Sequence, residues 1–358
     1  MSPAPRRYGT GDADLDTTVS ALVERVGVDA GPNADLIHEL VVSSLRLARD
    51  HASRGDLKIA SAALKEMRYS FHVFEPYRPV LKASIFGSAR TKPEDPLYEQ
   101  TRRLAAAVSE QGWMVITGAG PGIMAAGVEG AGVDRAFGVS IRLPFESTTP
   151  AFVDDDPKLV NFRYFFTRKL TFIKESDGFV LLPGGFGTLD EAFELLTLVQ
   201  TGKAQPAPIV LLDVPGGTYW LHWCQFVEAE LAPRSYIGPH DLALVRVTDD
   251  IDVAVDELTG FYANYRSLRF VGGRLVMRML RAPTGAALAA LNEEFADILT
   301  RGSIERIEPT KAEVADGDQL DAERLAFRFD RRSWARLRRL IDALNDRPSP
   351  VARPTPPA

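Results

Sequence analysis

The apolar positions of the chain follow three successive spacings. From Leu15 to about Arg78 they recur three and four residues apart, the spacing of one helix face, and Asn33 stands where a helix cap is expected. Short apolar runs then alternate with amphipathic segments, and a mixture of alternating runs and helix stripes follows from about Leu268. The expected divisions are 1–14 (disordered N-terminus), 15–80 (N-terminal helical layer), 81–265 (central domain), 266–346 (C-terminal domain) and 347–358 (disordered, Pro-rich tail).

The central domain has the pattern of a parallel sheet covered on both faces. Its apolar runs are nearly continuous, which is typical of strands buried on both sides. Helical segments separate the runs, as in repeated right-handed βαβ units. The expected fold class is therefore α/β, a Rossmann-like doubly wound parallel sheet. The expected strands are 82–87, 113–117, 136–141, 178–182, 208–213 and 243–247, and the expected helices are 96–111, 122–132, 161–175, 189–201, 218–231 and 250–262.

The C-terminal domain is expected to be a small α+β appendage. Two of its runs alternate between apolar and polar positions, as half-buried strands do, and two stripes have helical spacing. The predicted elements are strands at 274–280 and 325–329, a helix at 288–299 that is ended by Gly302, and a last helix at 334–344.

Charge and cysteine content narrow the possible partners. The 358 residues include 42 Lys+Arg and 48 Asp+Glu, a net charge of -6, so we expect no general attraction to nucleic acid or to anionic membranes. No apolar stretch approaches the roughly 18 residues of a membrane span, and no targeting segment is recognised. Cys224 is the single cysteine, and the five histidines lack metal-ligand spacing. We expect a reduced, metal-free cytoplasmic protein that binds small anions only at a local site.

Three strand-to-helix turns of the central domain are the candidate ligand site. In an open parallel sheet, ligands bind beyond the carboxyl ends of the strands, where such turns lie. Glycines let the backbone approach a ligand closely, and the helix after PGGFGT directs free N–H groups and the positive end of its dipole into the gap. We expect an anion there, most simply a phosphate. The candidate residues are Ser88 of FGSAR, Gly118, Gly120 and Gly122 of TGAGPG, and Gly184, Gly185, Phe186 and Gly187 of PGGFGT.

Of two common nucleotide-binding motifs, the dinucleotide motif is altered in this sequence and the P-loop motif is absent. The second turn has the pattern G-x-G-x-G instead of the dinucleotide pattern G-x-G-x-x-G, and Arg142 ends the next strand where an acidic residue would hold a ribose diol. The P-loop pattern G-x-x-x-x-G-K-[ST] does not occur. A single glycine-rich loop is explained equally well as a tight turn, but two in one sheet favour a nucleotide-like ligand.

Glu191 has two competing interpretations. Thr188 to Glu191 fits the capping box T-x-x-E, in which the glutamate folds back onto the threonine N–H, and on the residues alone this structural role is favoured. Beside a phosphate-binding helix end, the carboxylate would instead face the sugar of a bound nucleotide. There it would stabilise positive charge at the anomeric carbon or direct a water molecule toward it.

A second candidate group stands on the predicted helix 161–175. Asn161 is a plausible cap, and aromatic and aliphatic residues cover most of the helix circumference, so we expect the helix to be largely buried. Arg168 and Lys169 therefore stand where solvated charges are less expected. Their long side chains either reach solvent by snorkelling, or the planar guanidinium of Arg168 clamps a phosphate or a carboxylate.

These motifs resemble those of a known enzyme family. PGGFGTLDE matches the signature PGGxGTxxE, and the pair Arg168-Lys169 matches the RK pair, of the Lonely Guy (LOG) family of nucleoside 5′-monophosphate phosphoribohydrolases, long labelled lysine decarboxylases. Five further segments resemble the longer bacterial members of the family, which are close to nucleotide 5′-monophosphate nucleosidases. They are FGSAR, TGAGPGIMAAG, LPFE, YFFTRKLTF and ELLTLVQTGK. The resemblance covers about residues 82 to 260.

The resemblance implies a reaction. It is hydrolysis of the N-glycosidic bond of a purine, pyrimidine or cytokinin nucleotide to free base and ribose 5-phosphate, without metal or organic cofactor. Glu191 would be the catalytic carboxylate and Arg168 its essential partner, which reverses the preference for a cap. The family also implies a homo-oligomer that helps to complete the site. The residues implied to contact phosphate or substrate are Gly184, Gly185, Gly187, Thr188, Lys169, Glu146 and Thr197.

The sequence departs from the family pattern where base and ribose are expected. Ala119 and Ala125 replace a glycine and an acidic residue of the second turn, and STTPAF follows LPFE in place of an amide-rich stretch. Substrate choice is therefore open. A nucleotide-binding or molybdenum-cofactor carrier protein of the same fold is the alternative function, against which the intact pair of Arg168 and Glu191 argues. A lysine decarboxylase is the weakest interpretation, because no pyridoxal phosphate constellation accompanies Lys169.

An arginine-rich run marks the last helix. Its simplest interpretation is a solvated helix face, and contact with an anionic effector or a neighbouring subunit is the alternative. The run consists of Arg331, Arg332, Arg336, Arg338 and Arg339.

Overall fold

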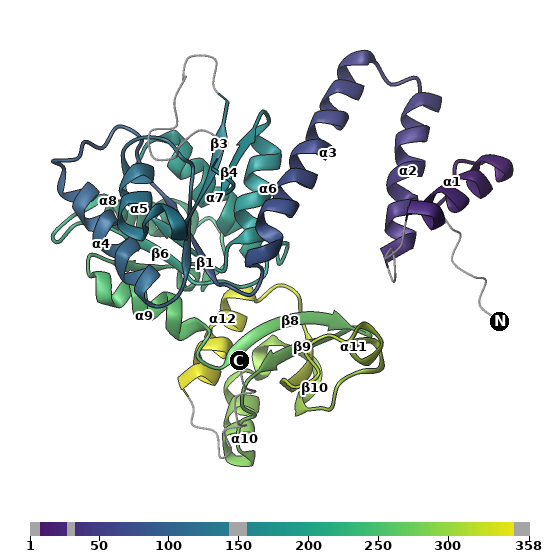
Figure 1. Cartoon of the computed structure of the whole chain (residues 1–358). Helices are drawn as coiled ribbons and strands as arrows, with labels where there is room; N and C mark the ends of the chain where they lie inside the picture. Colours follow the sequence, from purple (N-terminus) through teal and green to yellow (C-terminus); the bar gives the residue numbers. More distant parts are fainter. Residues whose placement is uncertain (1–7, 27–32, 143–155, 347–358) are drawn as a thin grey trace. The chain divides into compact units, whose positions relative to one another are not determined.

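The computed structural model describes residues 8–26, 33–142 and 156–346. By its contacts the chain divides into two compact units, Met1–Arg68 and Tyr69–Ala358. The second unit holds both the α/β domain and the C-terminal domain (Figure 1). None of the helices in the described ranges combines the length and the apolar character that a membrane crossing requires.

The first unit is helical, as predicted. Val19 and Val23 of its first helix pack against Val42 of its second. Asn33 occupies the N-cap position of the second helix, but its side chain makes no capping hydrogen bond. The helices are α1 (Ala13–Val26), α2 (Ala34–Arg49) and α3 (Arg54–Phe74), whose last turns belong to the second unit.

The α/β domain is built on a seven-stranded sheet in which every neighbouring pair of strands is parallel (Figure 1). The strand order is β4-β3-β2-β1-β5-β6-β7, so it reverses between β1 and β5. The predicted doubly wound fold is therefore confirmed. The strands are β1 (Lys82–Phe86), β2 (Met114–Thr117), β3 (Ala136–Ile141), β4 (Leu159–Phe162), β5 (Gly178–Leu181), β6 (Ile209–Leu212) and β7 (Arg246–Thr248).

Helices cover both faces of this sheet. Successive residues of a strand point to opposite faces, and in β1 Ile85 joins a core with Leu104 and Leu258, whereas Phe86 joins a second core with Phe172 and Leu195. The two cores explain why the strands are apolar at nearly every position. The helices are α4 (Pro96–Glu110), α5 (Ile123–Ala131), α6 (Phe165–Glu175), α7 (Phe186–Gln200), α8 (Tyr219–Phe226) and α9 (Ile251–Phe261).

The predicted helix 161–175 is in fact two elements. Its first residues belong to strand β4, and α6 begins only at Phe165, so Asn161 is a strand residue and not a helix cap. The prediction that this helix is largely buried is also wrong. Three of its large apolar side chains are exposed: Phe165 (52%), Phe166 (54%) and Leu170 (45%).

The C-terminal domain is a four-stranded antiparallel sheet of order β10-β11-β9-β8 (Figure 1). One face packs on α10 and α12 through residues such as Phe295, Phe327 and Leu337. The predicted helix 288–299 is wrong at its end, because Leu299 begins the edge strand β10, in which Gly302 lies. The elements are β8 (Tyr265–Val271), β9 (Arg274–Met279), α10 (Gly285–Glu294), β10 (Leu299–Arg306), α11 (Lys311–Asp316), β11 (Glu323–Phe329) and α12 (Trp334–Asp346).

Arginines of α12 dock this helix on its neighbours. Arg338 is 5% exposed and pairs with Glu257 of α9 and with Asp342, 3.0 Å away. Arg336 pairs with Asp297 at 2.9 Å. The interpretation of the arginine run as a solvated helix face is therefore wrong for Arg336 and Arg338, since both are held in ion pairs.

Candidate active site

The three predicted turns meet at one edge of the sheet. FGSAR follows β1 and PGGFGT follows β5, the two strands between which the strand order reverses. Ser88 joins the turns, because its N–H donates to the Pro183 carbonyl (3.3 Å) and its own carbonyl accepts from the Ile123 N–H (3.1 Å) at the start of α5. Open α/β sheets bind ligands at the carboxyl ends of the strands beside such a reversal.

Two glycines are required by the close approach of these turns. A Cβ atom on Gly184 would lie 2.2 Å from the Thr188 hydroxyl oxygen, and one on Gly122 would lie 2.4 Å from the Ser88 carbonyl oxygen. Ala119 adopts a φ of +59°, in the left-handed region that favours glycine. The backbone at Ala119 is therefore strained by roughly 1–2 kcal/mol, at the position where the family pattern has glycine.

Helix α7 begins with a free N-terminus. Its N-cap is Gly185, no side chain caps it, and Phe186 is 94% exposed. Thr188 is buried inside the first turn, so the capping-box interpretation of Thr188 and Glu191 is wrong. The first N–H groups of α7 have no partner within the helix, and together with the helix dipole they attract an anion.

Arg168 extends from α6 beneath the second turn. Its Nε donates to the Val139 carbonyl of β3 at 2.9 Å, and its guanidinium lies 5.2 Å from the centre of the Phe172 ring. A Cβ atom on Gly118 would lie 2.5 Å from Arg168 Nη2, so this glycine makes room for the guanidinium. Burial lowers the pKa of Arg168, and the negative charge of Glu191 opposes that shift.

Lys169 connects α6 with α7 through carboxylates. Its Nζ lies 2.5 Å from Glu194 Oε2, 2.9 Å from Asp190 Oδ2 and 3.8 Å from Glu191 Oε2. Burial alone would lower the pKa of Lys169, but hydrogen bonds to Glu194 and Asp190 and the charge of Glu191 outweigh burial, and the pKa is raised. The ammonium therefore stays charged beside Glu191.

Glu191 is the buried carboxyl of this group, 8% exposed. Burial raises its pKa to about 7, although the charges of Lys169 and Arg168 oppose the shift. In the described part of the chain, its one ion pair is the 3.8 Å contact with Lys169. A carboxyl that exchanges its proton near neutral pH in such a position is suited to acid-base chemistry.

Two of the predicted substrate residues do not join this group. Thr197 donates to the Phe193 carbonyl at 2.7 Å and lines a separate cavity of about 230 Å³ with Gln200 and Trp223, to which Glu191 does not contribute. Glu146 lies outside the described residues. Gly120 lies near the site but against Met124, whose Cε would be 2.5 Å from a Cβ added there.

Three residues of the site were not predicted. Asp190 and Glu194 hold Lys169, and the Tyr219 hydroxyl donates to the Gly184 carbonyl at 2.8 Å. The spacing of three residues between Glu191 and Glu194 is a signal for a shared helix face. Nothing in the sequence indicates the contact of Tyr219, which depends on the return of the chain after β6.

Fold and site together define a Rossmann-like α/β domain with an uncapped helix N-terminus and a buried carboxyl at one sheet edge. A family model described as "Possible lysine decarboxylase" matches residues 119–258. The cytokinin riboside 5′-monophosphate phosphoribohydrolase of Mycobacterium tuberculosis is 28% identical over 166 residues, which cover 44% of this chain and 83% of that protein. These matches confirm the resemblance: over its α/β domain, the chain is similar to members of the LOG family.

Plant relatives match over shorter stretches. The cytokinin riboside 5′-monophosphate phosphoribohydrolase LOG7 of Arabidopsis thaliana is 32% identical over 101 residues, 26% of this chain. LOG1 of the same plant is 38% identical over 72 residues, 20% of this chain. The chain thus spans only 45% and 32% of the length of these two relatives.

Solved structures with a similar fold include molybdenum-cofactor proteins. The molybdenum cofactor carrier protein of Chlamydomonas reinhardtii matches with a TM-score of 0.32 and 19% identity, over 50% of this chain and 98% of that one. The molybdenum cofactor binding protein of Rippkaea orientalis matches with a TM-score of 0.35 and 18% identity, over 50% and 94%. Likeness at this level does not bear on the function of the present chain.

Proposed function

We propose that this protein hydrolyses the N-glycosidic bond of nucleoside 5′-monophosphates, releasing free base and ribose 5-phosphate. The observation that carries the proposal is the position of Glu191, a buried carboxyl that follows the exposed glycine N-terminus of α7 and lies beside Lys169. Glu191 lies five positions after Phe186 in the helix, a rise of about 7.5 Å. A phosphate at the helix end and a sugar near Glu191 can therefore belong to one ligand.

The proposed reaction passes through positive charge on the sugar. The base leaves with the electrons of the C1′–N bond, and the oxocarbenium-like centre is stabilised by the carboxylate of Glu191. Glu191 also directs water to C1′; the hydroxyl adds to the sugar and the proton leaves with the base. Arg168 orients the substrate or the carboxylate, and the ion-paired Lys169 holds negative charge on Glu191.

Binding of the 5′-phosphate at the N-terminus of α7 is proposed to position the scissile bond. Binding energy from a part of the substrate that does not react can be used for orientation at the reacting centre. We therefore expect a nucleoside without phosphate to be a poor substrate. The residues proposed for phosphate and substrate are Gly184, Gly185, Phe186, Gly187, Thr188, Ser88, Gly118, Gly120 and Gly122, with Glu146 and Thr197 kept from the family resemblance.

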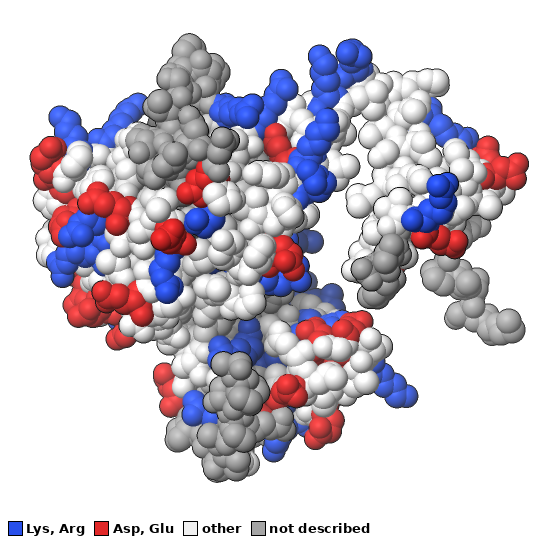
Figure 2. Space-filling view, viewed as in Figure 1, with Lys and Arg blue, Asp and Glu red and all other residues white. Residues whose placement is uncertain are grey.

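The base of the nucleotide substrate and the oligomeric state of the protein are also proposed. The relatives named above are cytokinin riboside 5′-monophosphate phosphoribohydrolases, so N6-prenylated AMP stands beside the ordinary nucleotides as a candidate substrate. The exposed side chains of Phe165, Phe166 and Phe193 on α6 and α7 favour a homo-oligomer, because large aromatic side chains are enriched at protein interfaces. On the face drawn in Figure 2, both signs of charge are interspersed over the α/β domain, which does not favour a nucleic-acid partner. The cytoplasmic location stays a prediction.

The state of Lys169 argues against a lysine-based mechanism. A lysine that forms a Schiff base must be neutral, and enzymes lower its pKa for that purpose. The ion pairs of Lys169 with Asp190 and Glu194 raise its pKa instead. A decarboxylase that uses Lys169 is therefore not supported.

The test is release of free base, quantified by chromatography, from AMP, CMP, GMP, UMP and N6-prenylated AMP, with adenosine as the phosphate-free substrate. Wild type is compared with Glu191→Gln and with Glu230→Gln, which removes an exposed carboxylate paired with Arg234. We expect Glu191→Gln to lose about 10²–10⁴-fold in kcat, and Glu230→Gln to match wild type.

Two results would overturn the proposal. If folded wild type releases no base from any of the five nucleotides, the chain is a binding protein of this fold. If Glu191→Gln releases base at the wild-type rate, the carboxyl of Glu191 does not take part in the reaction.

A further inference from the structure

The C-terminal sheet has one apolar face and one face rich in arginine. In β11, Leu325, Phe327 and Phe329 belong to the core beneath α10 and α12, so the alternate positions Arg324 and Arg328 lie on the opposite face. The register of the neighbouring strands adds further arginines to this face. They are Arg269 of β8, Arg274 and Arg278 of β9, and Arg301 of β10.

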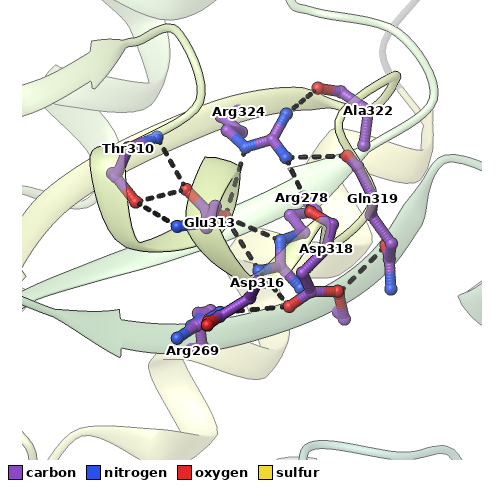
Figure 3. Close-up of polar contacts among 10 residues, drawn as sticks. Arg269, Arg278, Thr310, Glu313, Asp316, Asp318, Gln319, Ala322 and Arg324 are labelled. Atoms are coloured by element: carbon purple, nitrogen blue, oxygen red, sulfur yellow. Dashed lines mark hydrogen bonds and ion pairs between the residues drawn. The ribbon is translucent and has the colours of Figure 1, made fainter. Parts of the chain in front are cut away.

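Half of this arginine face is neutralised by α11 and the turn that follows it (Figure 3). Arg278 and Arg324 donate to Glu313 Oε1 at 2.9 and 3.2 Å. Asp318 accepts from Arg278 at 2.8 Å and from Arg269 at 3.1 Å. These arginines are therefore matched by carboxylates of the chain itself.

The other half of the face has a surplus of positive charge. Arg301 and Arg328 are direct partners across the β10–β11 ladder, and in the ranges that the structure describes neither guanidinium has an ion pair. Like charges in this position repel each other. Arg274 has one carboxylate partner, Glu305, at 2.7 Å. The three guanidinium groups and one carboxylate leave about two positive charges without a partner.

The surplus charge lines a hollow rather than a flat surface. Arg274, Arg301, Ser303 and Arg328 line an open cavity of about 270 Å³. Gly302 has a φ of +76°, and the ladder shifts register between Arg301 and Glu305. Such an interruption of the ladder bends an edge strand and redirects its side chains.

We propose that this hollow is a second ligand site, which binds a small anion through a diphosphate group. A diphosphate supplies the negative charge that the surplus requires, and planar guanidinium forks match phosphate oxygens with paired hydrogen bonds. The Ser303 hydroxyl, which donates to Glu305 Oε1 at 3.4 Å, would turn from that carboxylate to the ligand. The α11 half of the same face shows how acidic oxygens satisfy arginines at these strand positions. This inference does not depend on the proposed hydrolase activity.

The test measures binding of inorganic pyrophosphate to the full chain by titration calorimetry. The variant Arg301→Gln/Arg328→Gln removes the cross-strand pair. The control Arg332→Gln/Arg339→Gln removes two exposed arginines of the same domain and changes the net charge equally. Because pyrophosphate can also bind the N-terminus of α7, the difference between the two variants reports the hollow. We expect the dissociation constant of the hollow to rise about tenfold or more in the first variant only.

A thermal unfolding series guards against a variant that fails to fold. Without pyrophosphate, Arg301→Gln should melt no lower than wild type, because it changes an exposed edge-strand residue and relieves the repulsion. With pyrophosphate in excess, wild type and the control should gain thermal stability and Arg301→Gln should gain less. No binding by wild type, or an equal loss of binding in the control, would refute the site.

Discussion

Two stretches of this chain share the spacing T-x-x-E and use it in different ways. At Thr310 and Glu313 it is a capping box, in which Glu313 accepts from the Thr310 N–H at 3.0 Å and the Thr310 hydroxyl accepts from the Glu313 N–H at 3.3 Å. At Thr188 and Glu191 the helix has already begun at Phe186, so neither residue caps it. The spacing is therefore necessary for a capping box but does not specify one.

The two glutamates also differ in their hydrogen bonds. Burial alone would raise the pKa of Glu313, which is fully buried, but bonds from Thr310, Arg278 and Arg324 outweigh burial and lower the pKa to about 2. Burial raises the pKa of Glu191 to about 7. The charge of Lys169, 3.8 Å away, lowers this pKa and offsets the effect of burial only in part. A buried carboxylate with every oxygen satisfied stabilises the fold, whereas one with few partners keeps its reactivity.

The largest expected effect is a loss of protein stability when the structural glutamate, Glu313, is replaced. Glu313→Gln removes the negative charge shared by Arg278 and Arg324, and we expect the free energy of unfolding to fall by about 3–5 kcal/mol. Glu191→Gln removes a charge that burial disfavours, so the free energy of unfolding should stay unchanged or rise. Urea unfolding of both variants and wild type at pH 8 measures the difference. Equal losses would mean that both carboxylates are structural.

The pH dependence of stability should separate the same two residues. The folded pKa of Glu191, about 7, exceeds its ordinary value of 4.5, so its stabilising contribution is present below pH 4.5 and is lost as the pH rises to 7. The folded pKa of Glu313, about 2, lies below 4.5, so its contribution is present above pH 4.5 and is lost as the pH falls toward 2.

Urea unfolding at a series of pH values tests these opposite slopes. Between pH 4.5 and 7, the stability of Glu191→Gln should improve relative to wild type by about 3 kcal/mol, because the folded pKa of Glu191 is raised to about 7. Glu313→Gln should lose its disadvantage as the pH falls below 4.5. A constant difference between Glu191→Gln and wild type over this range would show that the pKa of Glu191 is not raised.

How far the sequence predicts the fold depends on how strongly each strand is buried. Central strands of the α/β sheet such as β1, β5 and β6 are predicted correctly, because both of their faces are covered and their runs are apolar throughout. β10 was missed because Ile304 is its one buried residue, so an edge strand of this kind carries no apolar signal. β4 gives no separate signal, because only two residues separate it from α6 and its sequence continues the pattern of that helix.

The site was predictable in its residues but not in its arrangement. The motif identified Glu191 and Arg168, whereas the first residue of α7 depends on contacts between distant turns. Gly184 packs against Thr188 and Ser88, which sets where the chain leaves β5 and begins the helix. No spacing within the motif contains that information, and so the capping box was favoured on the residues alone.

The smallest expected effect comes from the two threonines. Thr310→Val removes the side-chain cap of α11 and should cost about 1 kcal/mol of stability. Thr188→Val keeps the size and branching of a side chain that caps nothing, so the free energy of unfolding should change less. Its effect should instead appear as a higher KM for a nucleoside 5′-monophosphate, because Thr188 lies in the proposed phosphate turn. Paired unfolding and kinetic measurements decide the matter: if Thr188→Val costs as much stability as Thr310→Val and leaves KM unchanged, the threonine at α7 is structural and the phosphate must bind elsewhere.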